Sequence, residues 1–150
     1  MDGTTNEIEI EATPGVVFAV LVDPRTYPSW LVGAQTIRSV DDEWPKAGSA
    51  FRHRIGFGPA VIAGSTSIRR IEDDRLLELG AGMGPLGEAL VRFTVEPSDG
   101  GSTVTVEEVP NRGVARAMWK VLRPITNAGL WGRNAVSLNS LKEVVDGVRA

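Results

Sequence analysis

The segment IEATPGVVFAVLVDPRTYPSW, residues 10–30, carries the most specific local signals in the sequence. Thr13 followed by Pro14 predicts a helix start, because threonine suits the N-cap and proline suits the first helical position. The β-branched run at 16–22 would suit a strand by propensity alone, but the cap signal before it favours a short helix. The Asp23-Pro24 pair then predicts a second short helix within Pro24–Trp30, ending near Pro28.

Strand patterns lie on both sides of this segment. Before it, Ile8 and Ile10 alternate with glutamates, which is the period-two pattern of a half-buried strand. After it, alternating apolar positions and turn residues predict six strands, at 36–40, 51–57, 61–71, 75–83, 87–96 and 103–109. Short turns between successive strands favour an antiparallel meander. The closely spaced Gly80, Gly82 and Gly84 predict a strong bend, and therefore a curved sheet.

The spacing of apolar residues becomes helical after Pro110. Residues 113–149 place leucines such as Leu130, Leu138 and Leu141 on one face of a helix. Pro124 interrupts this pattern, because a proline inside a helix removes a hydrogen bond and clashes with the preceding turn. The segment is therefore predicted to form one kinked helix, or a short helix before Pro124 and a long helix after it.

This order of elements resembles the START-like, or SRPBCC, superfamily. The stretch from Ile10 to Phe18, followed by Asp23-Pro24 and Tyr27-Pro28-Ser29-Trp30, is similar to the opening of its polyketide cyclase/dehydrase branch, and Trp44-Pro45 with Gly48 and the 100–104 hairpin resemble later features. The resemblance covers nearly the whole chain and implies a single domain, residues 1–150, of the α+β class. It implies a helix-grip fold, with a curved antiparallel sheet of about seven strands wrapped around a long C-terminal helix and two short helices after the first strand. It also implies a deep, mostly apolar cavity between sheet and helix.

The bulk composition limits the functional classes. Lys and Arg total 16 against 19 Asp and Glu, a formal net charge of −3, so the basic footprint of a nucleic-acid-binding protein is missing. Cysteine is absent, which excludes disulfides, thiolate catalysis and cysteine metal sites. Residues 1–11 are polar and acidic, unlike a signal peptide, and no apolar run reaches the roughly 20 residues of a membrane span. A cytoplasmic location is therefore expected, and the oligomeric state stays open, a dimer included.

His53 is the single histidine and shares a strand face with Phe51 and Ile55. On an apolar face it is a candidate to orient a ligand or to act as a general base near neutral pH. The competing interpretations are a hydrogen-bonded core histidine and a register that turns it to solvent. A lone histidine does not make a typical zinc site, and the glycine-rich stretch at 80–84 lacks a phosphate-loop pattern, so no metal and no cofactor are expected.

Two further polar residues fall on predicted inner faces. Glu108 continues the alternation of Val104 and Val106, so an inward carboxylate would be a candidate acid or base. The preferred interpretation is nevertheless a strand end that turns Glu108 to solvent. Asn134 lies on the helical face of Leu130 and Leu138, where its amide is predicted either to bind a ligand or to contact the sheet.

The predicted ligand-binding residues are those expected to face the cavity from the sheet and the C-terminal helix. They are Phe51, His53, Ile55, Met83, Phe93, Val106, Met118, Trp119, Leu122, Leu130 and Asn134. Trp30 and Trp44 are predicted to have a structural role instead, because they belong to the motifs of the resemblance.

Two functions fit these residues. The first is a protein that binds a small hydrophobic or amphipathic molecule, such as a lipid or a polyketide-like compound, because the candidate polar groups are sparse. The second is a polyketide cyclase, aromatase or dehydratase acting on a ligand in the same cavity, with His53, Glu108 or Asn134 assisting proton transfer. The sequence offers no obligatory catalytic pair, which favours the first.

Overall fold

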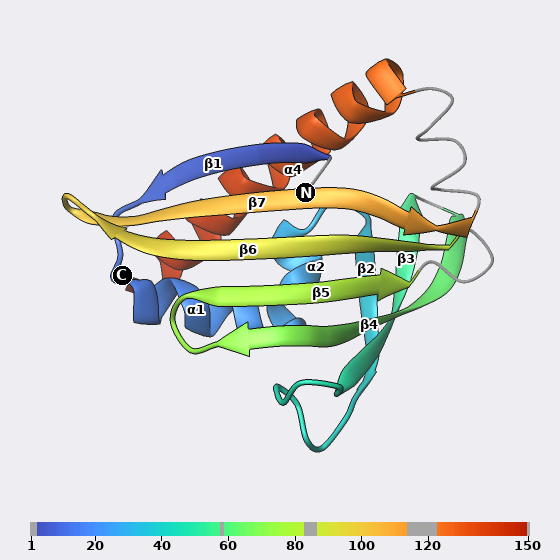
Figure 1. Ribbon diagram of the computed structural model, residues 1–150. Coiled ribbons are helices and arrows are strands. Elements are labelled where there is room, and N and C mark those ends of the chain that lie inside the picture. The colour runs from blue at the N-terminus through green and yellow to red at the C-terminus, as the bar shows by residue number, and fades with distance from the viewer. Residues whose placement is uncertain (1–2, 58, 83–86, 114–122, 150) are drawn as a thin grey trace.

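Seven antiparallel strands form one curved sheet (Figure 1). The computed structural model describes residues 3–57, 59–82, 87–113 and 123–149. The spatial order is β1-β7-β6-β5-β4-β3-β2, so the chain starts at one edge, crosses to the other and returns strand by strand until β7 pairs with β1. The predicted meander is therefore confirmed for β2 to β7. The strand bounds are β1 Thr4–Ile10, β2 Ala34–Val40, β3 Ala50–Phe57, β4 Ala60–Glu72, β5 Leu76–Gly82, β6 Glu88–Ser98 and β7 Gly101–Arg112.

The connection from β1 to β2 is helical, as the cap signals predicted. Helix α1 spans Pro14–Val22, with an extended Thr13 before it whose side chain makes no capping hydrogen bond. The second predicted helix is divided, because a 3-10 turn, η1, covers Pro24–Thr26 and α2 covers Tyr27–Trp30. The predicted end near Pro28 is wrong. Pro28 lies in the first turn of α2, where a residue without an N–H costs no hydrogen bond.

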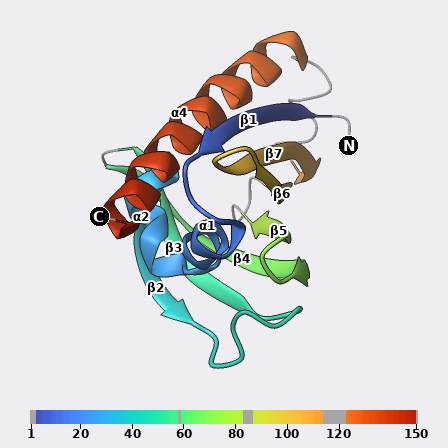
Figure 2. The same cartoon turned by 90° about the vertical axis from the view of Figure 1, so that its left-hand side faces the viewer.

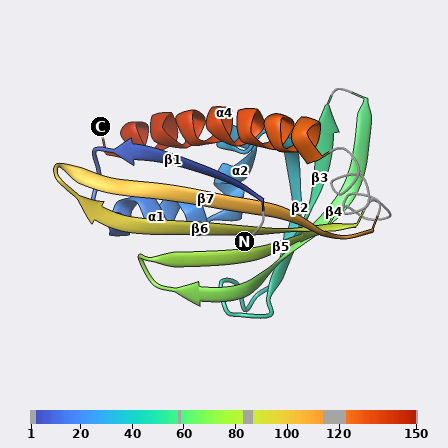
Figure 3. The ribbon, with the colours of Figure 1, turned by 45° about the horizontal axis from the view of Figure 1, so that its top comes forward.

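A long C-terminal helix, α4, spans Arg123–Arg149 and lies along β1 on the same side of the sheet as α1 and α2 (Figures 2 and 3). The described part of this helix begins at Arg123, one residue before Pro124, and the predicted short helix before Pro124 falls in residues 114–122, outside the described part of the chain. Leu138, Leu141 and Val145 of α4 are at most 2% exposed and pack in the core with residues of α1 and the sheet. In the described ranges, no helix is long and apolar enough to cross a membrane.

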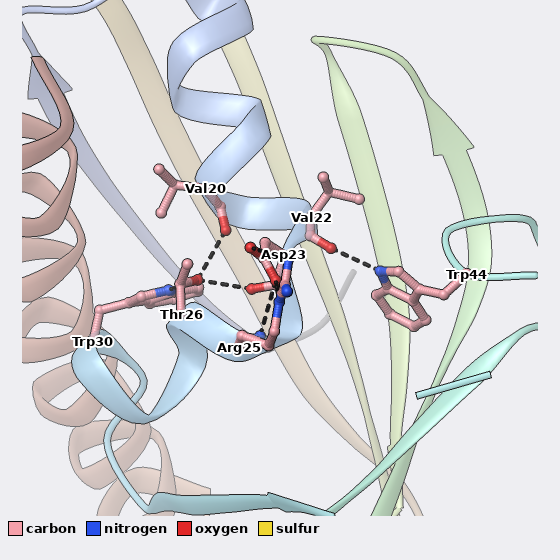
Figure 4. A network of polar contacts seen from close by, with 7 residues as sticks. All are labelled: Val20, Val22, Asp23, Arg25, Thr26, Trp30 and Trp44. Atoms are coloured by element: carbon pink, nitrogen blue, oxygen red, sulfur yellow. Dashed lines mark hydrogen bonds and ion pairs between the residues drawn. The ribbon is translucent and has the colours of Figure 1, made fainter. Parts of the chain in front are cut away.

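The turn between α1 and α2 is held by its own side chains (Figure 4). The Thr26 hydroxyl lies 2.9 Å from the Val20 carbonyl oxygen and 2.8 Å from that of Asp23, and it accepts a hydrogen bond from Trp30 Nε1 at 3.0 Å. The Asp23 carboxylate accepts a hydrogen bond from the Arg25 backbone N–H at 3.1 Å. These contacts satisfy the carbonyls at the end of α1 and fix the orientation of the Trp30 indole.

Trp44 ties the β2–β3 loop to the same region (Figure 4). Its Nε1 donates to the Val22 carbonyl oxygen at 2.7 Å, and its ring packs edge-on against Phe51 of β3 with centroids 5.1 Å apart. The predicted structural role of Trp44 agrees with this placement.

Two glycines allow a close approach of β4 and β5. A Cβ placed on Gly82 would lie 2.9 Å from the Ser65 carbonyl oxygen, and a Cβ on Gly64 would lie 2.8 Å from the Gly82 carbonyl oxygen. Both distances are shorter than normal carbon–oxygen contacts, so only glycine fits at these points. The register shift in this pair lies elsewhere, between Ile68 and Arg70, so Gly82 marks a close approach and not a bulge.

Candidate ligand-binding cavity

A cavity of about 380 Å³ lies between the inner face of the sheet and the helices α2 and α4. Its walls come from α2 and the loop after it, from strands β2 to β7, and from residues 133–138 of α4. Apolar side chains and glycines make up most of the wall, which is typical of small-molecule sites. The polar residues on the wall are Tyr27, His53, Thr66, Glu108, Arg133, Asn134 and Ser137.

Seven of the residues singled out in the sequence meet at this cavity. They are Phe51, His53, Ile55, Phe93, Val106, Glu108 and Asn134. Leu130 is half-buried and is not part of the described wall, to which α4 contributes residues between Arg133 and Leu138. Met83, Met118, Trp119 and Leu122 lie outside the described residues.

Aromatic rings form a continuous wall at the α2 side. Tyr27 packs edge-on against Trp30 and Phe51, with ring centroids 5.1 and 5.3 Å away, and Trp30 packs edge-on against Phe93 at 5.8 Å. These edge-to-face contacts are the favoured geometry for aromatic pairs. The Tyr27 hydroxyl donates to the Leu21 carbonyl oxygen at 2.6 Å, so its polar end is satisfied away from the cavity. Trp30 was predicted to be structural only, and it is both structural and part of the wall.

His53 is buried on the inner face of β3, with 6% of its surface exposed. Its Nε2 lies 2.9 Å from the Thr66 hydroxyl of β4, and its ring lies tilted against Phe51 at a centroid distance of 5.1 Å. The other ring nitrogen, Nδ1, is buried and has no hydrogen-bond partner among the described residues. Burial lowers the pKa of His53, so the neutral imidazole is the favoured form in the folded protein.

The residue opposite His53 is a glycine for a steric reason. Gly64 is the Cα partner of His53 in the β3–β4 pair. A Cβ on Gly64 would lie 3.3 Å from His53 Cε1, which is tighter than ordinary van der Waals contact. The absence of a side chain at 64 therefore leaves room for the imidazole on the inner face.

Glu108 points inward, so the preferred prediction of a solvent-facing carboxylate is wrong. Every second residue of β7 from Ser102 to Pro110 is buried, and Glu108 keeps this alternation with 4% exposure. A buried carboxylate needs a partner, and Arg133 Nη2 of α4 supplies one by donating to Glu108 Oε1 at 2.5 Å. The solvent-facing prediction assumed that the strand ends at Glu108, whereas β7 continues to Arg112.

Asn134 lies next to this ion pair and is 2% exposed. Its Oδ1 accepts a hydrogen bond from Arg133 Nη2 at 3.2 Å. Its Nδ2 is buried with no acceptor among the described residues, and the same holds for Arg133 Nε. One turn further along α4, the Ser137 hydroxyl accepts a hydrogen bond from the Val32 backbone N–H at 3.0 Å. The polar end of the cavity therefore contains donors that no protein group in the described ranges satisfies.

Sequence reasoning missed several wall residues, among them the polar residues Tyr27, Thr66, Arg133 and Ser137. Arg133 and Ser137 are four residues apart, and with Asn134 they form a polar patch beside an apolar helix face. That spacing was a usable signal for Arg133. Thr66 carried no signal of its own, since its contact with His53 depends on the β3–β4 register.

The polar groups of the wall permit binding and proton transfer. In the described ranges, no group of three or more His, Asp or Glu side chains is placed to hold a metal ion. His53 provides an imidazole with one free nitrogen, and α4 provides hydrogen-bond donors close to a compensated ion pair. The wall thus combines a large apolar area with two separate polar groups, His53 on β3 and the Arg133–Asn134 pair on α4.

A family model described as "Polyketide cyclase / dehydrase and lipid transport" matches residues 1–145. No curated protein matches the chain significantly.

Solved structures share the fold at low sequence identity. A Staphylococcus aureus protein of unknown function, SA2116, has a TM-score of 0.71 and 13% identity, covering 99% of this chain and 98% of that one. Protein NE0264 of Nitrosomonas europaea has a TM-score of 0.69 and 16% identity, with 95% and 93% covered. The di-domain ARO/CYC BexL from the BE-7585A biosynthetic pathway has a TM-score of 0.68 and 15% identity, and the match covers 93% of this chain and 48% of BexL. At these identities the likeness establishes the fold.

Proposed function

The chain belongs to the polyketide cyclase/dehydrase and lipid transport family, and from this premise we propose that it binds a small hydrophobic or amphipathic molecule in the cavity between the sheet and α4. The observation that carries the proposal is the cavity of about 380 Å³. This volume falls within the roughly 300–1,000 Å³ typical of small-molecule sites, and the apolar wall supplies affinity through burial.

The aromatic wall supports an unsaturated or aromatic ligand as well as an aliphatic one. Tyr27, Trp30, Phe51 and Phe93 hold one another in place, so a ligand meets a preorganised surface and little side-chain entropy is lost on binding. The isolated polar groups at His53 and at Asn134 give the ligand two points that fix its orientation.

A plugging substitution tests this function. Val91 of β6 lines the cavity, and Val91→Trp would fill part of the space with an indole. Thr94→Trp is the matched control, because Thr94 lies on the same strand and alternation places it on the opposite face. Displacement of the neutral fluorescent probe N-phenyl-1-naphthylamine, together with native mass spectrometry of freshly purified protein, would report occupancy. We expect Val91→Trp to lose probe binding at least tenfold more than Thr94→Trp, an estimate of about 1.4 kcal/mol or more. Equal binding by both variants would contradict the proposal.

A second candidate function is catalysis of cyclisation or dehydration on a polyketide-like chain. His53 favours it, because the neutral imidazole has one nitrogen free of protein partners and lies on the cavity wall. Such a base would remove a proton from the carbon between two carbonyl groups, and the resulting enolate would attack a further carbonyl of the same chain. The C=O bond of that carbonyl opens to an alkoxide, which takes the proton back from the His53 imidazolium. BexL, whose fold is similar, is described as an ARO/CYC protein.

The two functions differ in what His53→Asn does. A poly-β-ketone thioester analogue would be incubated with each protein and the products separated by mass spectrometry. For an enzyme, His53→Asn would abolish cyclised product while the analogue still binds. For a binding protein, the analogue would form cyclised product no faster with the wild-type protein than without any protein.

A further inference from the structure

We infer that the ligand is electrically neutral and places a carbonyl-type oxygen against Arg133 and Asn134. This inference rests on the proposed binding function and specifies the chemical class of the bound molecule. It follows from two features of the polar end of the cavity, which are its unsatisfied hydrogen-bond donors and its balanced charge.

Among the residues that line this end of the cavity, the two unsatisfied groups are both donors. Asn134 Nδ2 and Arg133 Nε are buried N–H groups without an acceptor in the described ranges, and the two residues are adjacent on α4. The orientation of the Asn134 amide is fixed, since its Oδ1 accepts from Arg133 Nη2 at 3.2 Å. A buried donor left unpaired costs about 1–3 kcal/mol, so a ligand that supplies an acceptor oxygen here gains affinity. Hydroxyl and carbonyl oxygens both accept, but a carbonyl oxygen has two lone pairs and no proton that needs a partner of its own.

The charge at this end is already compensated. Arg133 is paired with Glu108 at 2.5 Å, so the guanidinium has its counter-ion within the wall. The other titratable residues of the described wall are Tyr27 and His53. Burial raises the pKa of Tyr27 and lowers the pKa of His53, so both are neutral at neutral pH. The described wall therefore carries no net charge.

A ligand carboxylate would disturb this balance. It would bring a second anion beside Glu108, which is 4% exposed, and among the described wall residues the one cation, Arg133, is shared with Glu108. Burying an uncompensated charge in an apolar cavity is far more costly than burying a neutral carbonyl. The site therefore discriminates against free carboxylic acids and accepts ketones, esters and amides.

Four compounds with the same aromatic ring test this selectivity. Naphthalene, acetylnaphthalene, methyl naphthoate and naphthoate would each compete with N-phenyl-1-naphthylamine for the full-length protein at neutral pH. We expect the ketone and the ester to bind about tenfold more tightly than naphthalene, which corresponds to one satisfied hydrogen bond. Naphthoate should bind at least tenfold more weakly than its methyl ester. Naphthoate binding as tightly as the ester would overturn the inference and leave the proposed function standing. Failure of all four compounds to compete would overturn the proposed function, and the inference with it.

Two variants locate the effect. Glu108→Gln removes the anion and leaves the Arg133 charge free, so the preference should invert and naphthoate should bind more tightly than the ester. Glu107→Gln is the matched control, because the neighbouring side chain lies on the other face of β7. Asn134→Leu should reduce the advantage of the ketone over naphthalene without weakening naphthalene itself. The comparison of naphthoate with its methyl ester on the wild-type protein tests the charge selectivity even where a variant does not fold.

Discussion

At the scale of single residues, His53 gives the folded protein a specific dependence on pH. It is the only histidine in the chain, and burial lowers its pKa below the ordinary value of 6.5. The unfolded chain therefore binds a proton at a higher pH than the folded chain does. As the pH falls from about 6.5 toward the folded pKa, the free energy of unfolding should decrease, by up to about 1.4 kcal/mol per pH unit.

The variant His53→Asn isolates this contribution. Asparagine does not titrate. The unfolding free energy of the wild type relative to the variant should therefore decrease as the pH falls below about 6.5, and should be constant at higher pH. Urea unfolding at a series of pH values measures both curves. Carboxylates with a lowered pKa, such as Asp41 beside Arg52, are present in both proteins and cancel in the difference. A pH-independent difference would show that burial does not affect the imidazole in this way.

The pair Glu108–Arg133 should contribute more to stability than a surface pair. Arg133→Met leaves the buried carboxylate of Glu108 without its counter-ion, at an expected cost of about 1–3 kcal/mol, reduced because the Arg133 side chain is 33% exposed. Adding Glu108→Gln to the same chain should recover part of this loss. The pair Lys142–Asp146, whose side chains are 42% and 41% exposed, is the control, and Lys142→Met should cost less than about 0.5 kcal/mol. Urea unfolding of the four variants measures the coupling, and additive effects of Glu108→Gln and Arg133→Met would contradict it.

Single residues also show where sequence reasoning reached its limit. The alternation in β7 was sufficient to place Val104 and Val106 on the inner face, and the structure extends it to Glu108. The sequence could not show that Arg133, 25 residues later, reaches the same point, because that depends on how α4 is rotated against the sheet. The solvent-facing prediction for Glu108 rested on a strand end at this point, and β7 in fact continues to Arg112.

At the scale of elements, the turn between α1 and α2 depends on one hydroxyl. Thr26 Oγ1 contacts two backbone carbonyls and accepts from Trp30 Nε1. Thr26→Val keeps the shape but removes these bonds and leaves a buried indole N–H unpaired. We expect a loss of about 1–3 kcal/mol in unfolding free energy, measured by urea denaturation followed by circular dichroism. Thr26→Ser keeps the hydroxyl and should lose less than about 1 kcal/mol. Similar losses for both variants would assign the effect to packing of the methyl group.

The boundaries of an element were predicted well where local sequence determines them. They were predicted less well where pairing with a neighbouring strand lengthens the element. The helix start at Pro14 follows from local cap chemistry, and the structure places α1 there. The first strand was predicted from the isoleucine alternation at Ile8 and Ile10, but β1 begins at Thr4. Its early residues lack that pattern and are ordered by pairing with β7, where Thr4 lies opposite Glu108. Tertiary hydrogen bonding of this kind extends a strand beyond its sequence signal.

At the scale of the whole molecule, the sequence was sufficient for the architecture and insufficient for the chemistry of the cavity. Strand alternation, turns and the helical period indicated a curved antiparallel meander followed by a long helix, the family resemblance implied that the sheet wraps around this helix, and both are confirmed. Periodicity placed His53 and Asn134 on apolar faces, the resemblance implied the cavity, and both residues lie on its wall. Which of their atoms stay unpaired depends on contacts between elements, such as that of His53 with Thr66, and periodicity carries no information on those contacts.

The cavity also couples ligand binding to the stability of the whole fold. A molecule that binds only the folded chain stabilises it by about 2.7 kcal/mol at a concentration one hundred times its Kd. For a chain of 150 residues this should raise Tm by roughly 5–10 °C, so a thermal scan with saturating methyl naphthoate should show a clear shift. Val91→Trp fills space on the wall of the cavity and should remove the shift, whereas Thr94→Trp on the opposite face should retain it. If the plugged variant is stabilised as much as wild type, the compound binds elsewhere, and the cavity of about 380 Å³ is not the site through which binding and folding are linked.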